Sequence, residues 1–320
     1  GSYVPPDILT NDNLSEMVDT SDEWIRTRTG ICNRHIAKDM DNADMAYNAA
    51  RNAVEDARIE ASKIGLIIVA TSTPDYAFPN QASLVQAKLK AVNAMCFDVS
   101  AACSGFITAL DIAASMLKAG SYKYALVGSE KMSEIVNWKD RSVCVLFGDG
   151  AGAVVLKAVD NNTEDVTGAL VGHERGIIDS NIYNDGTGAS VLTGGRRFSD
   201  SCSTDIFIHM DGQEVFKFAV KSVPTAIETL LHNNNMDINE VDKFILHQAN
   251  VRIIESVAKR LKADKDKFPV NLNEYGNTSS ASIPILLDEL NRNGSLKQGE
   301  KLVLAGFGAG LSWGSILLVW

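Results

Sequence analysis

Segments whose apolar residues recur at helical spacing alternate along the chain with short apolar runs that suit buried strands. Helical spacing occurs in the segments 42–59, 81–90, 104–120, 221–234 and 251–263. Compact apolar runs predict strands at 64–72, 94–100, 123–130 and 241–250. Segment 144–159 predicts two strands joined by a glycine turn, and segment 301–320 echoes it. Such alternation predicts an α/β protein with mostly buried sheets.

The second half of the chain repeats the plan of the first. FDVSAACSGFITALDIAASML and FPVNLNEYGNTSSASIPILLDEL both predict a strand, a turn of small residues and a helix. Cys103 and Asn277 occupy these comparable turns, 174 positions apart. The strand-like runs 66–69 and 244–247 are offset by about the same number of positions. We therefore expect an internal duplication, with equivalent strand ends converging on a site between the halves.

We expect the N-terminal half to span residues 1–165 and to carry Cys103. The C-terminal half is expected to span residues 166–320 and to carry His247 and Asn277. Between them, the polar and glycine-rich region 160–205 predicts a loop or a hairpin insertion.

Composition and charge exclude several classes of function. The chain is 45% hydrophobic with a net charge of −10, which argues against general nucleic-acid binding. No run approaches the roughly 18 apolar residues of a membrane helix. The chain has five cysteines, namely Cys32, Cys96, Cys103, Cys144 and Cys202. Their number is odd, and their spacing forms no metal-binding cluster with the histidines. We expect free thiols in a reducing cytoplasm and no metal.

Cys103 is the strongest candidate for chemistry, because it lies between a predicted strand and a predicted helix. The positive end of a helix dipole stabilises a thiolate. The neighbouring Ala102, Ser104 and Gly105 are small enough to let a substrate approach. A small buried hydrophobe is the alternative, and the local context leaves both interpretations open.

His247 and Asn277 are candidate partners of Cys103. His247 ends an apolar strand in FILHQAN, and Asn277 occupies the turn equivalent to that of Cys103. A structural histidine and a helix N-cap are the alternatives for these two residues. Together, a thiol, an imidazole and an amide suit acyl-thioester chemistry, in which the thiolate attacks and neutral donors hold the oxyanion or enolate.

Two glycine-rich motifs also lie at predicted turns. FGDGAGAVVL resembles a nucleotide-binding glycine loop, but its spacing is wrong and a strand follows it, so a tight turn is expected. The turn in GFGAGLSWG could bring backbone N–H groups to Cys103.

Basic residues after the His247 strand predict either a solvated helix face or a docking site for an acidic partner.

Six segments together resemble the β-ketoacyl-[acyl carrier protein] synthase III family, the initiating condensing enzymes of bacterial fatty acid synthesis. They are MVDTSDEWIRTRTGI, FDVSAACSGF, FGDGAGA, ILHQANVRII, YGNTSSASIP and GFGAGLSWGS, and they occur in the family's order. The resemblance implies the thiolase fold, a five-layered αβαβα sandwich of two duplicated halves, in a homodimer. It implies Cys103 as the acylated nucleophile, His247 and Asn277 as ligands of the malonyl thioester carbonyl, and backbone N–H groups of Cys103 and Ala309 as the oxyanion hole.

The same resemblance assigns binding residues. It places coenzyme A against Thr20, Trp24, Arg28, Arg141, Gly212, Phe216, Ala249 and Asn250. Phe78 would reach the partner subunit's acyl pocket, where its bulk favours short primers. The acidic carrier protein would dock on Lys217, Arg252, Lys259 and Arg260.

The resemblance implies a substrate pair and no separate cofactor. A short acyl group moves from acyl-CoA to Cys103 and condenses with malonyl-acyl carrier protein, releasing carbon dioxide and giving a 3-oxoacyl-acyl carrier protein. A quinolone or other secondary-metabolite synthase on the same fold is one alternative. A non-catalytic acyl-binding protein is another, against which the presence of Cys103, His247 and Asn277 argues.

Overall fold

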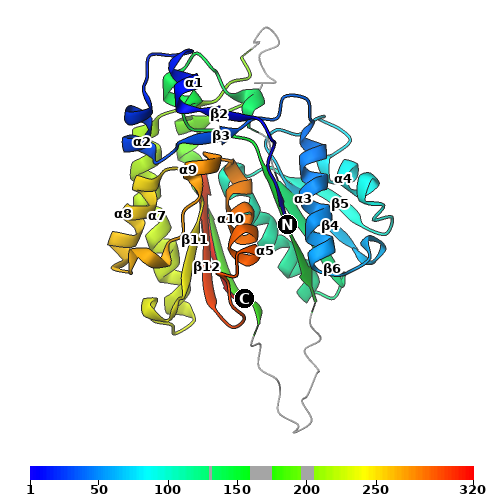
Figure 1. The fold of residues 1–320 in the computed structure, drawn as a ribbon. Coiled ribbons are helices and arrows are strands. Elements are labelled where there is room, and N and C mark those ends of the chain that lie inside the picture. Colours follow the sequence, from blue (N-terminus) through cyan, green and yellow to red (C-terminus); the bar gives the residue numbers. More distant parts are fainter. Residues whose placement is uncertain (130–131, 159–174, 196–204) are drawn as a thin grey trace.

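The computed structural model describes residues 1–129, 132–158, 175–195 and 205–320. Two sheets stand side by side, each covered by helices on its outer face and separated by a shared pair of helices (Figure 1). The expected boundary between halves, at residues 165 and 166, lies outside the described residues.

The N-terminal sheet is built around parallel strands whose residues are almost uniformly apolar. Its order is β1 (Ser2–Tyr3), β7 (Ala151–Lys157), β6 (Tyr124–Ser129), β4 (Leu66–Ala70) and β5 (Met95–Val99). Strand β4 pairs in parallel with both β5 and β6, and its five residues are buried. A strand covered on both faces must be apolar throughout, which explains the run LIIVA.

The C-terminal sheet repeats the order of the first four of these strands and has no counterpart of β5 among the described residues. It runs β8 (Gly176–Asn184), β13 (Ser312–Val319), β12 (Lys301–Gly308) and β11 (Lys243–Leu246). Strand β11 pairs in parallel with β12, whereas β13 is antiparallel to both of its neighbours. Strands β11 and β12 begin 177 positions after their counterparts β4 and β6 (66 and 243, 124 and 301). The shared order of four strands supports the internal duplication expected from the sequence.

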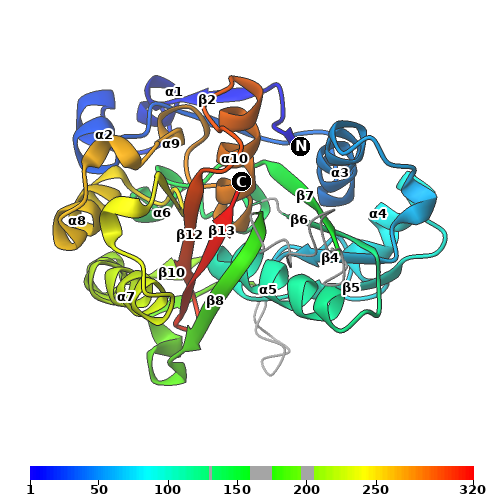
Figure 2. The same ribbon diagram turned by 90° about the horizontal axis from the view of Figure 1, so that it is seen from below.

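Helices complete a five-layered αβαβα arrangement (Figures 1 and 2). The central layer holds α5 (Gly105–Lys118) and α10 (Ser282–Arg292), and α5 contacts strands of both sheets. On the outer faces lie α3 (Asn42–Asp56) and α4 (Gln81–Leu89) against the first sheet, and α7 (Gly212–Asn233) and α8 (Val251–Leu261) against the second. Both central helices are buried along most of their length, so their N-terminal ends are held rigidly.

Short elements gather at one end of the two sheets, uppermost in Figure 1. They are α1 (Asn11–Ser15), α2 (Asp22–Thr29), α6 (Arg141–Cys144), α9 (Leu272–Tyr275), and the pairs β2 (Ile8–Thr10) with β3 (Asn33–His35) and β9 (Leu192–Thr193) with β10 (His209–Met210). The chain reaches the N-termini of α5 and α10 on this side, so these short elements surround the place where Cys103 and Asn277 lie.

Three of the expected elements were wrong. Cys144 was expected in a strand but ends the short helix α6, which the Asp140 carboxylate caps by accepting the Ser142 N–H. The strand expected after Phe268 is replaced by loop and α9. The region 160–205 was expected to be a loop or a hairpin insertion, yet Gly176–Asn184 forms β8 of the C-terminal sheet, and other parts of the region lie outside the described residues.

The described residues contain neither a helix that could cross a membrane nor a cluster of side chains that could hold a metal ion. None of their helices combines the length and apolar character needed to cross a membrane. No group of three or more His, Cys, Asp or Glu side chains among them is placed to hold a metal ion.

Candidate active site

Cys103 lies at the N-terminal end of a central helix, as the sequence predicted. It belongs to the 3₁₀ turn Ala102–Ser104, which leads directly into α5, and only 7% of its surface is exposed. The Ser279 hydroxyl donates to its sulfur at 3.3 Å. A hydroxyl donor and the helix N-terminus both favour the thiolate over the thiol, so the surroundings suit a nucleophile.

The end of strand β12 closes against the Cys103 turn. A Cβ added at Gly308 would come within 2.9 Å of the backbone nitrogen of Cys103, so only glycine allows this approach. The turn beyond is braced, because the Ser312 hydroxyl donates to the Ala309 carbonyl at 2.7 Å and hydrogen-bonds Ser104 at 2.7 Å. These contacts fix the 308–309 backbone beside the cysteine.

His247 follows β11 and is buried, with 1% of its surface exposed. Its Nδ1 lies 2.7 Å from the Ser282 hydroxyl, and the Phe307 ring packs edge-on against the imidazole at 5.2 Å between centroids. Burial lowers the pKa of His247 to about 3, and the backbone carbonyl of Ser279, which favours the protonated ring, offsets this only in part. The imidazole is therefore neutral at neutral pH.

Asn277 lies in the second central turn, opposite Cys103. Its backbone N–H donates to the Leu146 carbonyl at 2.8 Å, and its carbonyl accepts the Gly148 N–H at 3.1 Å. Its side-chain Oδ1 accepts the Ser279 N–H at 2.8 Å. The asparagine thus caps a local turn, while Ala281 is the N-cap residue of α10. With Oδ1 engaged, the amide Nδ2 is the group of Asn277 that can donate to a ligand.

Arg34 stabilises the segment that holds Asn277, a role that the sequence did not suggest. It is fully buried, and its Nε and Nη2 atoms donate to the Val145 carbonyl at 3.2 and 2.6 Å. Burial lowers the pKa of Arg34 to about 10. Its side chain packs beside Gly148 and Gly276, where an added Cβ would come within 3.2 and 3.0 Å of it. Arg34 therefore holds in place both Gly276, which precedes the asparagine, and the 145–148 segment that pairs with it.

A cavity of about 550 Å³ has Cys103, His247 and Asn277 in its wall. Six of the eight residues expected to contact coenzyme A also line it, namely Trp24, Arg28, Gly212, Phe216, Ala249 and Asn250. Lys217 and Arg252 contribute to the same wall. The structure therefore brings the three candidate catalytic side chains to one space that also carries cationic side chains.

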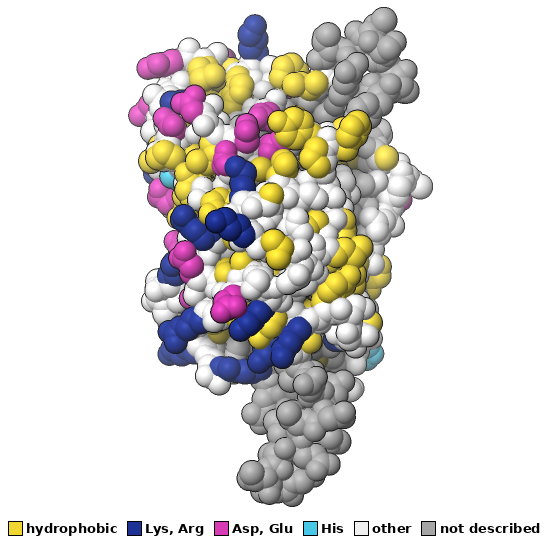
Figure 3. Space-filling view, turned by 90° about the vertical axis from the view of Figure 1, so that its right-hand side faces the viewer, with side chains coloured by type: hydrophobic (Ala, Val, Ile, Leu, Met, Phe, Trp, Pro, Cys, Tyr) yellow, Lys and Arg dark blue, Asp and Glu magenta, His cyan; other side chains and the backbone are white. Residues whose placement is uncertain are grey.

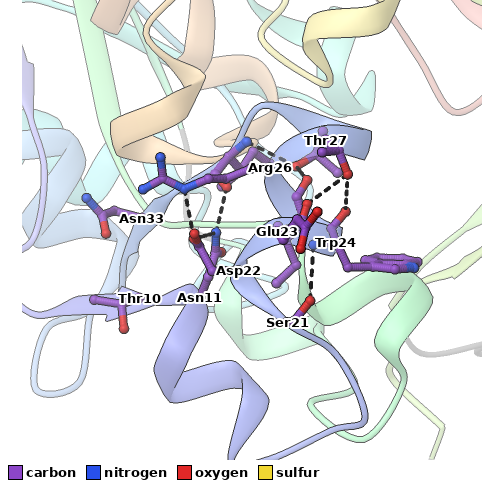
Figure 4. A network of polar contacts seen from close by, with 12 residues as sticks. Thr10, Asn11, Ser21, Asp22, Glu23, Trp24, Arg26, Thr27 and Asn33 are labelled. Atoms are coloured by element: carbon purple, nitrogen blue, oxygen red, sulfur yellow. Dashed lines mark hydrogen bonds and ion pairs between the residues drawn. The ribbon is translucent and has the colours of Figure 1, made fainter.

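Trp24 is presented by helix α2. The Ser21 hydroxyl caps this helix by accepting the Trp24 N–H at 3.2 Å, and Asp22 joins Asn11 and Arg26 (Figure 4). The guanidinium groups of Arg28 and Arg141 lie 4.6 and 4.9 Å from the centroid of the Trp24 ring. Trp24 and Arg141, both expected to bind coenzyme A, are thus in contact with each other, and Arg141 also donates to the Asp19 carbonyl at 2.7 Å.

Several expected site residues do not line the cavity. They are Thr20, Phe78, Arg141, Lys259, Arg260 and Ala309. Thr20 has a buried hydroxyl oxygen with no hydrogen-bond partner among the described residues. Phe78 is 87% exposed and projects from the molecule. Lys259 and Arg260 are exposed on α8, and Arg260 donates to the Val220 carbonyl at 3.3 Å.

Other residues of the site went unnoticed in the sequence. Ser279 and Ser282 contact the sulfur and the imidazole, but a run of small residues gives no sign of which hydroxyl faces inward. Phe307, Leu192 and Met210 also line the cavity, and the last two come from the β9–β10 pair. Only the fold brings these distant segments together.

Two duplicated halves in an αβαβα sandwich, with a cysteine where a central helix begins, define an enzyme of the thiolase fold. Residues 97–186 match the family described as 3-Oxoacyl-[acyl-carrier-protein (ACP)] synthase III, and residues 231–320 match its C-terminal part. The chain belongs to this family.

Individual relatives agree with this membership. The Beta-ketoacyl-[acyl-carrier-protein] synthase III of Clostridium botulinum is 48% identical over 328 residues, which covers 100% of this chain and 97% of the relative. The crystal structure of 3-oxoacyl-[acyl-carrier-protein] synthase III from Aquifex aeolicus is 45% identical, with a TM-score of 0.91 over 100% of this chain and 98% of that one. A priming β-ketosynthase of a polyketide biosynthetic pathway is 36% identical, with a TM-score of 0.90 over 100% and 94%.

Proposed function

We propose that this protein transfers a short acyl group from acyl-CoA to Cys103 and condenses it with malonyl-acyl carrier protein, which initiates fatty acid synthesis. The observation that carries the proposal is the meeting of Cys103, His247 and Asn277 in the wall of one cavity. The higher identity to synthase III relatives, 48% against 36% for the priming β-ketosynthase, favours fatty acid synthesis over polyketide initiation.

In the first step the Cys103 thiolate attacks the carbonyl carbon of acyl-CoA. The new bond joins sulfur to the acyl carbon, the bond to the coenzyme A sulfur breaks, and coenzyme A leaves as a thiolate that takes up a proton. Backbone N–H groups of Cys103 and Ala309 would stabilise the intermediate oxyanion. The braced 308–309 turn supports this assignment, since it holds the backbone against the cysteine.

In the second step the malonyl thioester replaces coenzyme A. The bond between its C2 carbon and the carboxylate breaks, carbon dioxide leaves, and the electron pair forms an enolate whose oxygen accepts hydrogen bonds from His247 and Asn277. The C2 carbon then attacks the acyl carbon on Cys103, and the sulfur leaves as the regenerated thiolate. A neutral His247 suits this role, because the site then needs a donor and no added charge.

Coenzyme A would lie along the cavity towards α2. Its adenine would stack on Trp24, which requires Arg141 to move from its present place against that ring. Arg28 offers a guanidinium for a phosphate, and Thr20, Gly212, Phe216, Ala249 and Asn250 would border the pantetheine arm. Acyl-CoA is a substrate in this scheme, and the reaction as written uses no further cofactor.

The carrier protein would approach over α8 and the start of α7. Lys217, Arg252, Lys259 and Arg260 are all exposed there, on a chain whose net charge is −10. A local positive surface on an acidic protein suits an acidic partner. We place the enzyme in the cytoplasm, where its cysteines would stay reduced. Cys202 lies outside the described residues.

We also propose a homodimer built on β5. This strand forms one edge of the N-terminal sheet, and an uncovered edge invites pairing. Apolar side chains gather on the face that presents α4 and β5 (Figure 3). Tyr76, Phe78, Val92 and Met95 are 59%, 87%, 74% and 49% exposed. Phe78 would then enter the partner subunit, as its expected role in the acyl pocket requires.

Mass spectrometry after incubation with acetyl-CoA tests the function directly. We expect one added acetyl group on Cys103, none in Cys103→Ser, and carbon dioxide release when malonyl-acyl carrier protein follows. Asn277→Ala should keep the acetyl adduct and lose decarboxylation by roughly 100-fold, the usual effect of removing one oxyanion donor. An unmodified Cys103 in the wild-type protein would reject the enzyme proposal, and equal loss of both steps in Asn277→Ala would reject the role of the asparagine.

A further inference from the structure

The hydrogen-bond partner of His247 determines which of its two ring nitrogens carries hydrogen. Nδ1 faces the Ser282 hydroxyl at 2.7 Å, and both residues are buried, with 1% and 2% of their surfaces exposed. The ring also forms part of the wall of the cavity. A neutral imidazole has a single N–H group, so the bond at Nδ1 decides whether Nε2 offers a hydrogen or a lone pair.

The two contacts of the Ser282 hydroxyl together indicate the direction of its bond to His247. The Gln248 N–H donates to the Ser282 oxygen at 3.2 Å, and a backbone N–H can act only as a donor. The hydroxyl oxygen therefore accepts in that bond and keeps its own hydrogen for a second partner. Among the residues that the structure describes, Nδ1 of His247 is the only possible acceptor within reach of that hydroxyl, and a buried hydroxyl hydrogen is rarely left without an acceptor, so Ser282 donates to Nδ1. This arrangement leaves a lone pair on Nδ1 and a hydrogen on Nε2.

We propose that Ser282 is a positioning residue that holds His247 in the Nε2–H tautomer, so that the ring donates to the thioester carbonyl during decarboxylation. The inference rests on the proposed function, in which His247 holds the enolate oxygen. Ser282 is the first residue of α10, one of the two central helices, so its hydroxyl is set by the rigid core. The serine never touches the substrate and acts through the imidazole alone.

The chemistry of the step requires this tautomer. Charge develops on the thioester oxygen as carbon dioxide leaves, and a lone pair on Nε2 would repel it, whereas an N–H group stabilises it. The Ser279 carbonyl is the competing acceptor near the ring. If that carbonyl took the hydrogen on Nδ1, Nε2 would present its lone pair. Ser282 opposes that outcome by donating to Nδ1 itself.

Nitrogen NMR on protein labelled in its five histidine rings tests the tautomer without any substrate. We expect the His247 signals, assigned by their loss in His247→Gln, to show a protonated Nε2 and an unprotonated Nδ1. Ser282→Ala should shift these signals towards the other tautomer. The matched control is Ser280→Ala, because Ser280 is equally buried in the same turn but donates to the Ala70 carbonyl. Its His247 signals should not change.

Steady-state kinetics provide a second test of the role of Ser282. Ser282→Ala should lower the kcat of malonyl-carrier decarboxylation roughly 10- to 100-fold, in line with the loss of one buried hydrogen bond, while KM and the rate of Cys103 acetylation stay unchanged. Ser282→Thr, which keeps a hydroxyl, should restore most of the kcat. A protonated Nδ1 in the wild-type spectrum overturns the proposal, even if Ser282→Ala does not fold. Full decarboxylation by His247→Gln would instead overturn the proposed role of the histidine and leave the tautomer result standing.

Discussion

His247 shows how burial at the site affects a single residue. Its pKa is about 3 in the folded protein, against an ordinary value of 6.5. Below pH 6.5 His247 therefore binds a proton in the unfolded chain but stays neutral in the folded protein. The free energy of unfolding is therefore not reduced by His247 above pH 6.5, and it falls as the pH decreases towards 3. The limiting slope is about 1.4 kcal/mol per pH unit for one proton.

Replacement by a residue that does not titrate should remove this slope. We expect His247→Gln to gain stability relative to the wild-type protein by up to about 1.4 kcal/mol for each pH unit below 6.5. Urea unfolding of both proteins at pH 7.5, 6 and 5 measures the difference. Parallel profiles for the two proteins would mean that the imidazole is not kept neutral by burial.

Individual residues of the site differ in how far the sequence alone could indicate them. Cys103, His247 and Asn277 could be proposed because each lies at a strand end or turn that the duplicated pattern makes visible. Ser282 could not, because the run TSSAS offers four hydroxyls and only the packing of α10 decides which one meets the imidazole. Arg34 was missed for a related reason, since an arginine normally indicates a surface and here it is fully buried.

At the scale of elements, α8 joins the site to a docking surface. Its first residue follows the Asn250 cap, while Arg252 lines the cavity and Lys259 is exposed two turns further on. A change at Arg252 would therefore disturb acyl-CoA and carrier together, whereas Lys259 reports on the carrier alone. This separation makes Lys259 the sharper probe of the proposed surface.

We expect Lys259→Glu to raise the KM for malonyl-acyl carrier protein roughly three- to tenfold, because an attractive charge becomes repulsive. The KM for acetyl-CoA should not change, and the effect should shrink as salt is added. Lys63→Glu, an equal charge reversal at an exposed position in the other half of the molecule, is the control. Equal KM values for the carrier in Lys259→Glu and Lys63→Glu would remove α8 from the docking surface.

Helices and strands could be predicted where the apolar residues follow one clear period. The predictions were wrong where side-chain hydrogen bonds take the place of pairing between strands. The strand expected after Phe268 does not form. Instead the Gln248 side chain accepts the Asn271 N–H and donates to the Pro269 carbonyl, as a neighbouring strand would. Strand β8 was hidden by Asp179 and Asn181, polar residues that suggest a loop. In the structure both have partners, since Asn234 donates to Asp179 and Asn181 donates to the Ala226 carbonyl.

At the scale of the whole molecule, the duplication explains why the site lies where it does. Equivalent central helices begin at the same level, so the turns of Cys103 and Asn277 face each other across the middle of the molecule. Each turn has one non-glycine residue with positive φ, Ala102 at 44° and Ser279 at 52°. The repeat could be read from sequence spacing, but the meeting of its two turns is a property of the folded sandwich alone.

The outer edge of strand β5 has no neighbouring strand in the described chain, so its backbone N–H and C=O groups there are available to pair with a second copy of the molecule. If a second copy covers it, Phe78 becomes buried in each subunit, and burial of one such side chain contributes roughly 1.5–3 kcal/mol. We expect Phe78→Asp to weaken the dimer at least tenfold in sedimentation and to reduce acetylation of Cys103, since each acyl pocket would lose the partner's side chain. Ile8→Asp, at another exposed apolar position on β2, should do neither. A wild-type protein that sediments as a monomer at micromolar concentration would refute the dimer, and with it the role of Phe78 in the acyl pocket.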